Sequence, residues 1–334
     1  MSAEQHRGRA FSLMPGMRGS NSSSQNDTRQ PKLHLETSSK AAGVLVSVCV
    51  YALAFAAAVL AVRSLGPHQP LVVVGLGDLV ATVVVFAGSV LANNSSIYDP
   101  YWSVQPAAIA GYYLWLSYPH VGARQVLVAA LAFLYALRLT SNFYRDWPGL
   151  SKEDFRYADF RRRFRRMYWP VSFVGIHLFP TVMVYVGCLP LYAVMQAGTG
   201  ALGWLDILGT LVTLAAVVLA FVADEQLRVF RRGPLNKGKA IRSGLWKHTR
   251  HPNYFGEMST WWGFYAFALG AGLRWWWTGV GALAITLMFV SISVPLMERR
   301  ELDRRSGYRE YVEQTPALLP FRTFGRSRTA RSGA

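Results

Sequence analysis

The sequence is short of charged residues and of cysteine. Only 16% of its 334 residues are charged, against about 25% in soluble domains, which argues against an ordinary soluble protein. The two cysteines, Cys49 and Cys188, both lie within apolar runs, so neither a structural disulfide nor a metal site is expected. Residues 1–40 lack the apolar run of roughly 7–15 residues that a secretory signal requires, and no such signal is predicted.

Acidic residues are also scarce. The chain has 18 Asp and Glu against 35 Lys and Arg, a net charge of +17, and such a balance can indicate binding to nucleic acid. Here, however, the basic residues stand in short runs between long apolar segments, and 52% of the chain is hydrophobic. Basic loops beside apolar segments fit an anionic membrane face better. We therefore expect the lipid bilayer as a partner, and no nucleic acid.

Apolar runs long enough to cross a hydrocarbon core of about 30 Å recur along the chain. They lie at 41–62, 71–92, 171–196, 205–224 and 275–297, with three further runs at 104–118, 124–143 and 256–272. The predicted fold class is all-α, a polytopic membrane helical bundle of about eight spans. With eight spans the four most basic segments fall on one side, so the positive-inside rule predicts that both termini are cytosolic.

Composition divides the chain into three parts. Residues 1–40 are polar and Ser-rich without apolar periodicity, and we predict a disordered tail there. Residues 41–321 form the predicted membrane domain with its cytosolic loops. Residues 322–334 are predicted to be a basic tail.

The densest polar motif runs from Gly244 to Glu257 and directly precedes an apolar run. Pro252 suits the first turn of a helix, so we expect a helix to begin there. Asn253 and Glu257 are then four residues apart on one face. Because the free N–H groups of a helix N-terminus favour anions, this face can bind a phosphorylated or carboxylated ligand.

Two other segments can meet this motif on the cytosolic side. Asp224, Arg228 and Arg231 follow one another at helical spacing at the end of a predicted span, and arginine forks suit phosphates. The alternative is a basic helix end that pairs with lipid headgroups.

A polar helix predicted after the last span is the second of these segments. It would carry Glu301, Arg304, Tyr308 and Tyr311 on one face that closes over the same pocket. The alternative for this helix is an amphipathic interfacial helix.

The loop 93–103 contains Asp99, Pro100, Tyr101 and Trp102 in succession. This run can be a plain interfacial turn, since Asp-Pro starts turns and aromatic residues prefer interfaces. It can also be a wall that faces a substrate.

Asp78 and His177 are polar residues at depth within predicted spans. Each is either a functional residue or an interhelical hydrogen-bond partner.

Several short motifs, taken in order, resemble an uncharacterised membrane family of the steroid 5-alpha-reductase-like superfamily. The motifs are Asp99–Ser103, Leu137–Asn142, Glu153–Tyr157, Ala223–Asp224 with Gln226, Gly244–Trp246, Arg250–Glu257, and Gly307–Tyr308 with Tyr311. The resemblance covers residues 71–321. Members of that superfamily include steroid 5-alpha-reductases, sterol C14 and C7 reductases, and isoprenylcysteine carboxyl methyltransferases.

The resemblance implies an adenine-nucleotide cofactor held between the C-terminal spans and the cytosolic loops. By its pattern and by membership of the shared pocket, the candidate cofactor residues are Asp224, Arg228, Arg231, Trp246, Arg250, His251, Asn253, Tyr254, Glu257, Arg304, Tyr308 and Tyr311. The acid pair of the reductases has no clear match in the early spans. Asp99, Tyr98 and Tyr101 are therefore catalytic candidates by location only.

The predicted function is an NADPH-dependent reductase of a carbon–carbon double bond in a membrane lipid, such as a sterol, an enone or an unsaturated acyl chain. NADPH is favoured over NADH because arginines lie near Asp224. The alternatives are a membrane methyltransferase that uses S-adenosylmethionine and a non-catalytic lipid-binding scaffold. We expect a multi-pass protein of the endoplasmic reticulum if the chain is eukaryotic, and of the plasma membrane if it is bacterial.

Overall fold

The computed structural model describes residues 39–64, 69–197 and 199–319. The predicted C-terminal tail, 322–334, lies outside these ranges. The predicted N-terminal tail, 1–40, also lies outside them, apart from residues 39 and 40. Within these ranges the chain forms helices and loops and no strand. The all-α prediction is confirmed for the part of the chain that the structure describes.

Thirteen α-helices occur in these residues. They are α1 (Lys40–Ser64), α2 (Pro70–Leu91), α3 (Tyr101–Ser117), α4 (Ala123–Asp146), α5 (Phe155–Phe164), α6 (Tyr168–Ser172), α7 (Phe179–Gly187), α8 (Leu189–Gln196), α9 (Trp204–Arg232), α10 (Pro252–Ala271), α11 (Gly279–Met288), α12 (Val294–Arg304) and α13 (Tyr308–Gln314). As predicted, α10 begins at Pro252. Two π-helical turns, Phe173–Leu178 and Phe289–Ser293, join α6 to α7 and α11 to α12.

Six segments are long and apolar enough to cross a membrane. They are α1, α2, α4, the segment Phe155–Gln196, α9 and the segment Leu273–Arg304. The two other predicted spans are helical as well, as α3 with 17 residues and α10 with 20, but they are not among these six. The structure thus supports a multi-pass membrane protein with six candidate spans.

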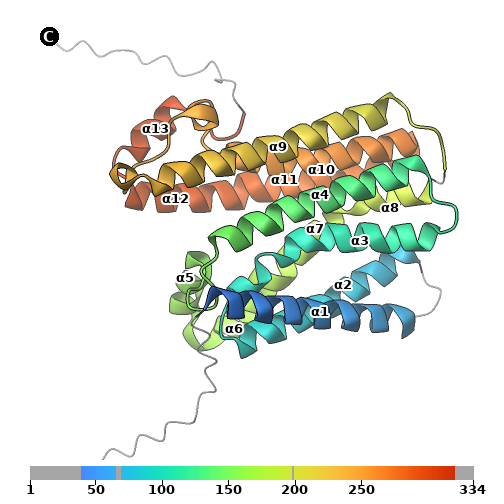
Figure 1. The fold of residues 1–334 in the computed structure, drawn as a ribbon, viewed down its shortest axis with the longest axis horizontal. Helices are drawn as coiled ribbons and strands as arrows, with labels where there is room; N and C mark the ends of the chain where they lie inside the picture. The colour runs from blue at the N-terminus through green and yellow to red at the C-terminus, as the bar shows by residue number, and fades with distance from the viewer. Residues whose placement is uncertain (1–38, 65–68, 198, 320–334) are drawn as a thin grey trace, which may run out of the picture. The chain divides into compact units, whose positions relative to one another are not determined.

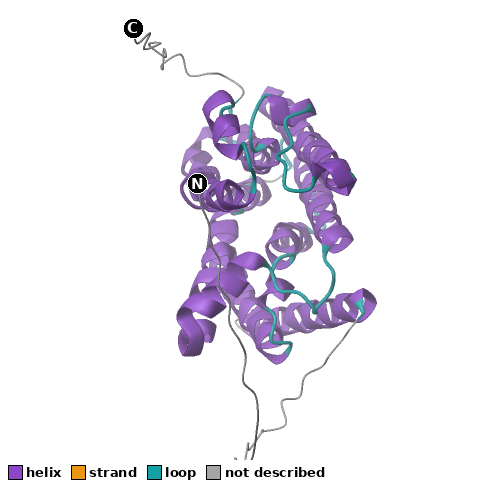
Figure 2. Ribbon diagram, turned by 90° about the vertical axis from the view of Figure 1, so that its left-hand side faces the viewer, coloured by secondary structure: helices purple, strands orange, loops and turns teal. Residues whose placement is uncertain are grey.

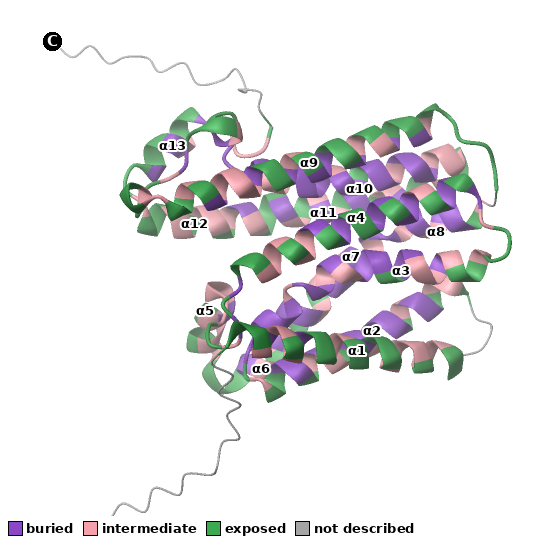
Figure 3. Ribbon diagram, viewed as in Figure 1, coloured by how far each residue is buried: buried purple, intermediate pink, exposed green. Residues whose placement is uncertain are grey.

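The outer surface of the bundle agrees with a lipid environment. Large apolar side chains such as Leu53, Leu60, Leu211 and Leu287 are each more than half exposed, and exposed residues recur along α1, α9 and α11 (Figure 3). Contiguous apolar surface of this kind is rare on soluble monomers. These helices therefore present their outward faces to the hydrocarbon.

The helices α9, α10 and α11 run side by side, and α4 lies between them and the α1–α2 pair (Figure 1, Figure 2). The contact between α9 and α10 is close because small residues face each other. A Cβ on Gly256 would lie 2.6 Å from the carbonyl oxygen of Ala216, and one on Gly263 would lie 2.1 Å from Oγ1 of Thr213. Such small residues let membrane helices approach closely, and this contact fixes the register between α9 and α10.

The helix predicted after the last span is interrupted. The last helical residue of α12 is Arg304, and α13 starts only at Tyr308, after Gly307 with φ of +75°. The extended backbone of Arg305 ends α12, and Gly307, in a left-handed conformation that glycine adopts at little cost, leads into α13. The prediction of one continuous helical face from Glu301 to Tyr311 is therefore wrong.

Candidate functional site

A buried arginine joins three helices at the centre of the site. The guanidinium of Arg138, on α4, forms ion pairs with Asp224 of α9 and Glu257 of α10. The carboxylate of Asp224 also accepts hydrogen bonds from the side-chain amides of Asn142 and Asn253, both at 3.1 Å. Because buried charges are tolerated only when paired and hydrogen-bonded, this cluster holds α4, α9 and α10 in one arrangement.

Sequence reasoning missed Arg138. A long arginine side chain in a span can extend to the membrane surface, so its position in the sequence does not by itself indicate a site. Arg138 is instead 8% exposed and turns inward to the two carboxylates. The available signal was that Arg138 is the charged residue well inside the predicted span 124–143, and such a residue needs a partner.

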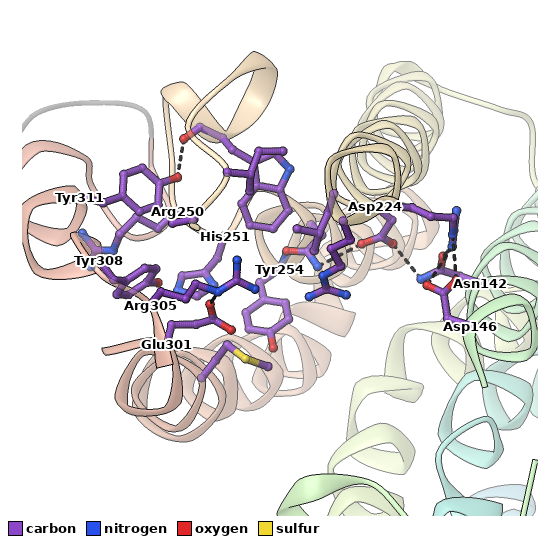
Figure 4. A pocket seen from close by; sticks show the side chains of 18 residues that line it. Asn142, Asp146, Asp224, Arg250, His251, Tyr254, Glu301, Arg305, Tyr308 and Tyr311 are labelled. Carbon is purple, nitrogen blue, oxygen red and sulfur yellow. Dashed lines mark hydrogen bonds and ion pairs between the residues drawn. The ribbon is translucent and has the colours of Figure 1, made fainter. Parts of the chain in front are cut away.

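A polar cavity of about 210 Å³ lies between α9, α10, α12 and α13. Figure 4 shows how side chains from these elements converge on it. The predicted cofactor residues that line it are Asp224, Arg228, Arg231, Trp246, Arg250, His251, Asn253, Tyr254, Tyr308 and Tyr311. Residues far apart in the sequence thus form one pocket.

Two predicted cofactor residues lie elsewhere. Glu257 faces a neighbouring cavity, and Arg304 is exposed and lines no cavity described here. Arg305 lines the polar cavity in its place, because α12 ends at Arg304 and the chain turns there. Sequence reasoning also missed Asn142 and Asp146, which line the polar cavity, whereas Glu301 lies in its wall as predicted.

The arginines of the polar cavity differ in their partners. Nε of Arg228 lies 2.9 Å from Oδ1 of Asp146, and Nη2 of Arg250 lies 2.7 Å from Oε1 of Glu298. Arg305 pairs with Glu301. Arg231 forms no hydrogen bond or ion pair with the residues that the structure describes. Arg231 is therefore the cavity arginine whose donors stay free for a ligand.

The segment after α12 is tied to the loop before α10. The backbone N–H groups of Arg250 and His251 donate to the carbonyl oxygens of Pro316 and Ala317, at 2.9 and 3.0 Å, and the Tyr311 hydroxyl donates to the carbonyl of Trp246. Burial raises the pKa of Tyr311 to about 12, so its hydroxyl stays a neutral donor. This part of the chain covers the polar cavity.

A second cavity, of about 320 Å³, adjoins the first. The residues common to both walls are Asn142, Asp224, Asn253, Tyr254 and Met297. Its remaining lining is largely apolar and includes Trp102, Leu139, Phe160, Phe179, Trp261, Ile285, Met288, Phe289 and Leu296. Polar and apolar compartments therefore meet at the Arg138 cluster.

Both π-helical turns face this apolar cavity. Gly175 and Ile176 belong to one turn, Phe289 and Ile292 to the other, and all four line its wall. A π-helical turn widens a helix locally and is frequently found at functional sites. The two turns lie where a ligand would need room.

Asp99 and Tyr98 lie at the other end of the apolar cavity. Asp99 accepts a hydrogen bond from the Tyr157 hydroxyl and pairs with Arg156 at 3.3 Å. Burial raises the pKa of Asp99 to about 7, although the Arg156 charge acts against this rise. The Tyr98 hydroxyl lies 2.9 Å from Oγ1 of Thr181. An acid that titrates near neutral pH thus faces the cavity.

Tyr101 lines a different cavity, although its ring centroid lies 5.5 Å from that of Tyr98. Its hydroxyl donates to Oδ1 of Asp78 at 2.9 Å, and Nε2 of Gln105 approaches Oδ2 of Asp78 at 2.5 Å. These three residues line a third, apolar cavity of about 730 Å³, which shares no lining residue with the other two. The three catalytic candidates are thus divided between two cavities.

The other polar residue at depth, His177, is also fully engaged. Its ring nitrogens lie 3.0 Å from Oγ of Ser89 and 3.0 Å from the carbonyl oxygen of Ser172. His177 therefore connects α2 to the π-helical turn 173–178, which agrees with the interhelical hydrogen-bond interpretation.

A family model described as "Protein of unknown function (DUF1295)" matches residues 85–315. The chain belongs to the DUF1295 family. It is also 27% identical, over 277 residues, to an uncharacterized protein of Schizosaccharomyces pombe; the alignment covers 75% of this chain and 80% of that protein. No solved structure matches the chain.

The DUF1295 region coincides with the joined cavities. Every residue that lines the polar and the apolar cavity falls within 85–315, whereas the third cavity is partly built from α1 and α2 residues before this region. The joined cavities are therefore the site that belongs wholly to the DUF1295 fold.

Proposed function

We propose that this protein is an NADPH-dependent reductase of a carbon–carbon double bond in a membrane lipid. One observation carries the proposal: a polar cavity with an unpaired arginine joins an apolar cavity at a buried charged cluster. A reaction between a charged nucleotide and an apolar lipid needs both compartments, and it needs them in contact.

The residues present fit this cofactor. Pockets for ligands of this size measure about 300–1,000 Å³, so the polar cavity alone, at about 210 Å³, is too small. A dinucleotide would extend across the shared wall into the apolar cavity. Trp246 and Tyr308 would flank the adenine, Arg231 would contact a phosphate, and Asn253 would reach the nicotinamide amide at the wall.

The cofactor, when bound, supplies hydride to the double bond. The protein must then align the lipid, exclude water and deliver a proton. Asp99 is the favoured proton donor, because an effective general acid has a pKa near the working pH and the pKa of Asp99 is raised to about 7 by burial. Burial also raises the pKa of Tyr98, which makes that hydroxyl the weaker acid.

We further infer that α3 and α10 cross the membrane together with the six candidate spans. Without them the basic segment 141–170 would fall on the opposite side from the segment 298–334, against the positive-inside rule. Eight spans would place both termini on the cytosolic side, and we propose that the chain belongs to the steroid 5-alpha-reductase-like superfamily that its motifs resemble.

Ligand-dependent stabilisation of the purified protein tests the function. A ligand at a hundredfold excess over its Kd stabilises the native state by about 2.7 kcal/mol. We expect NADPH to raise the melting temperature in detergent, and S-adenosylmethionine to leave it unchanged. A shift with S-adenosylmethionine alone would point to a methyltransferase and overturn the proposal.

Two variants locate the binding. Asn253→Ala removes a polar group from the wall shared by the cavities and should weaken NADPH binding about tenfold or more. His248→Ala serves as the control, since His248 lies in the same loop but lines neither cavity. Equal losses in both variants would place the NADPH site elsewhere.

A further inference from the structure

The arginines around the polar cavity are not equivalent. Carboxylates neutralise Arg228, Arg250 and Arg305 through the contacts described above. Arg231 is exposed and contacts no carboxylate, although it lines the same cavity. Among the described residues that form the wall, it is therefore the arginine that can accept an anion without first losing an internal partner.

We propose that Arg231, flanked by Arg305, forms a subsite for a phosphomonoester dianion, and that this subsite makes the protein select NADPH over NADH. The inference rests on the proposed function, because it assigns the 2′-phosphate of the cofactor to these two side chains. It concerns specificity, whereas the proposed function concerns binding and reduction.

The charges around Arg231 favour such an occupant. Arg305, Glu301, Asp146 and Asp224 line the same cavity as Arg231. Arg231 and Arg305 are thus two cations in the wall of one cavity, and the carboxylates Glu301 and Asp146 are engaged with Arg305 and Arg228. A dianion at this position would offset their mutual repulsion, and its oxygens suit the arginine fork.

Helical geometry explains why Arg231 has this role and its neighbour does not. Asp224, Arg228 and Arg231 occupy one face of α9 and line the cavity. Arg232 is turned about 100° from that face, is exposed, and lines no cavity described here. Arg232 is a matched control, because it has the same charge, lies at the same helix end and is also exposed.

The test compares NADPH and NADH binding to the full-length protein in detergent, for the parent, Arg231→Ala and Arg232→Ala. Charged hydrogen bonds of this kind correspond to about tenfold to a hundredfold in affinity. We expect Arg231→Ala to lose that factor for NADPH and to keep its affinity for NADH. Arg232→Ala should bind both as the parent does. A melting curve for each variant without ligand shows whether it is folded, and Arg231→Gln replaces Arg231→Ala if the latter is not.

Two outcomes would overturn the inference. One is an equal loss for NADPH and NADH in Arg231→Ala, which would place the side chain at a group common to both. The other is an Arg231→Ala variant that binds both NADPH and NADH with the affinity of the parent.

A second probe separates this inference from the proposed function. Adenosine 2′,5′-bisphosphate and adenosine 5′-monophosphate differ by the 2′-phosphate alone. If the parent binds the bisphosphate more tightly in an Arg231-dependent manner but does not bind NADPH, the subsite stands and the reductase proposal fails. If the parent shows no preference for the bisphosphate, the subsite is refuted.

Discussion

The buried charge cluster gives the strongest test of the site. We predict that Arg138→Met destabilises the protein and also abolishes cofactor binding. In the parent, Arg138 and Glu257 are both less than a tenth exposed, and the side chain of Asp224 is 12% exposed. Removing the arginine leaves two neighbouring carboxylates buried without their cation.

The size of the effect follows from the burial. Breaking a buried ion pair by removing one partner costs about 3–5 kcal/mol, because the remaining charge is uncompensated. Here one substitution strands two carboxylates, so we expect a loss at the upper end of that range. The variant Arg138→Met with Asp224→Asn and Glu257→Gln should regain most of the stability, since amides carry no charge to strand.

The protein contains a matched control on the same pair of helices. Arg124 of α4 binds Asp206 of α9 through two contacts, at 2.6 and 2.8 Å, and both side chains are almost fully buried. This pair lies at the opposite end of α4 from the cavities and lines none of them. Arg124→Met should therefore lose comparable stability and retain cofactor binding at temperatures where it is folded.

The assay combines unfolding in mixed micelles with NADPH binding isotherms. Arg138→Met should unfold at lower denaturant and bind no NADPH, whereas Arg124→Met should only unfold early. The reasoning is refuted if Arg138→Met is as stable as the parent. It is also refuted if the folded triple variant, or Arg138→Met itself, binds NADPH with the affinity of the parent.

Three further predictions follow from individual positions. The pKa of Asp99 is raised to about 7 from an ordinary 3.8, so between these pH values the folded state binds a proton that the unfolded state does not. The free energy of unfolding should therefore rise as pH falls from 8 to 5. Activity should fall above pH 7, because the general acid ionises there. Unfolding and rate measurements across pH should show both trends in the parent and neither in Asp99→Asn. If that variant keeps the stability profile of the parent, the titrating group is another residue. Gly263→Leu should prevent correct assembly of α9 and α10, since even a Cβ there lies 2.1 Å from Oγ1 of Thr213, and a parent-like melting curve would contradict this packing. Reporters at both termini and near Lys237 should be cytosolic while one near Gly200 is not, and a C-terminus on the far side would exclude the eight-span arrangement.

Periodicity predicted the parts of the site that lie on one uninterrupted helix. Asp224, Arg228 and Arg231 share a face of α9 because 3.6 residues make a turn, and all three line the polar cavity. The same rule failed at Arg304, because it was applied across the break between α12 and α13, where Arg305 is extended and Gly307 is left-handed. Helical spacing is informative only while the helix continues.

Neighbours in the sequence can also line different cavities. Tyr98 and Tyr101 are three residues apart, yet one lines the apolar cavity beside Asp99 and the other binds Asp78 in the third cavity. Their ring centroids lie 5.5 Å apart, but the hydroxyl of Tyr98 contacts Thr181 and that of Tyr101 donates to Asp78. Location in one loop was therefore insufficient to group the catalytic candidates.

The sequence by itself determined the membrane class, the helical fold and most of the residues of the polar cavity. Apolar runs and helical faces are local properties, which each segment carries regardless of its neighbours. Only the tertiary structure decided that Arg138 pairs with Asp224 and Glu257, which lie 86 and 119 residues away in the chain. It also decided that the polar cavity shares part of its wall with an apolar one. Pairing between distant charges depends on which helices become neighbours, and packing between helices, rather than any local pattern, sets that arrangement.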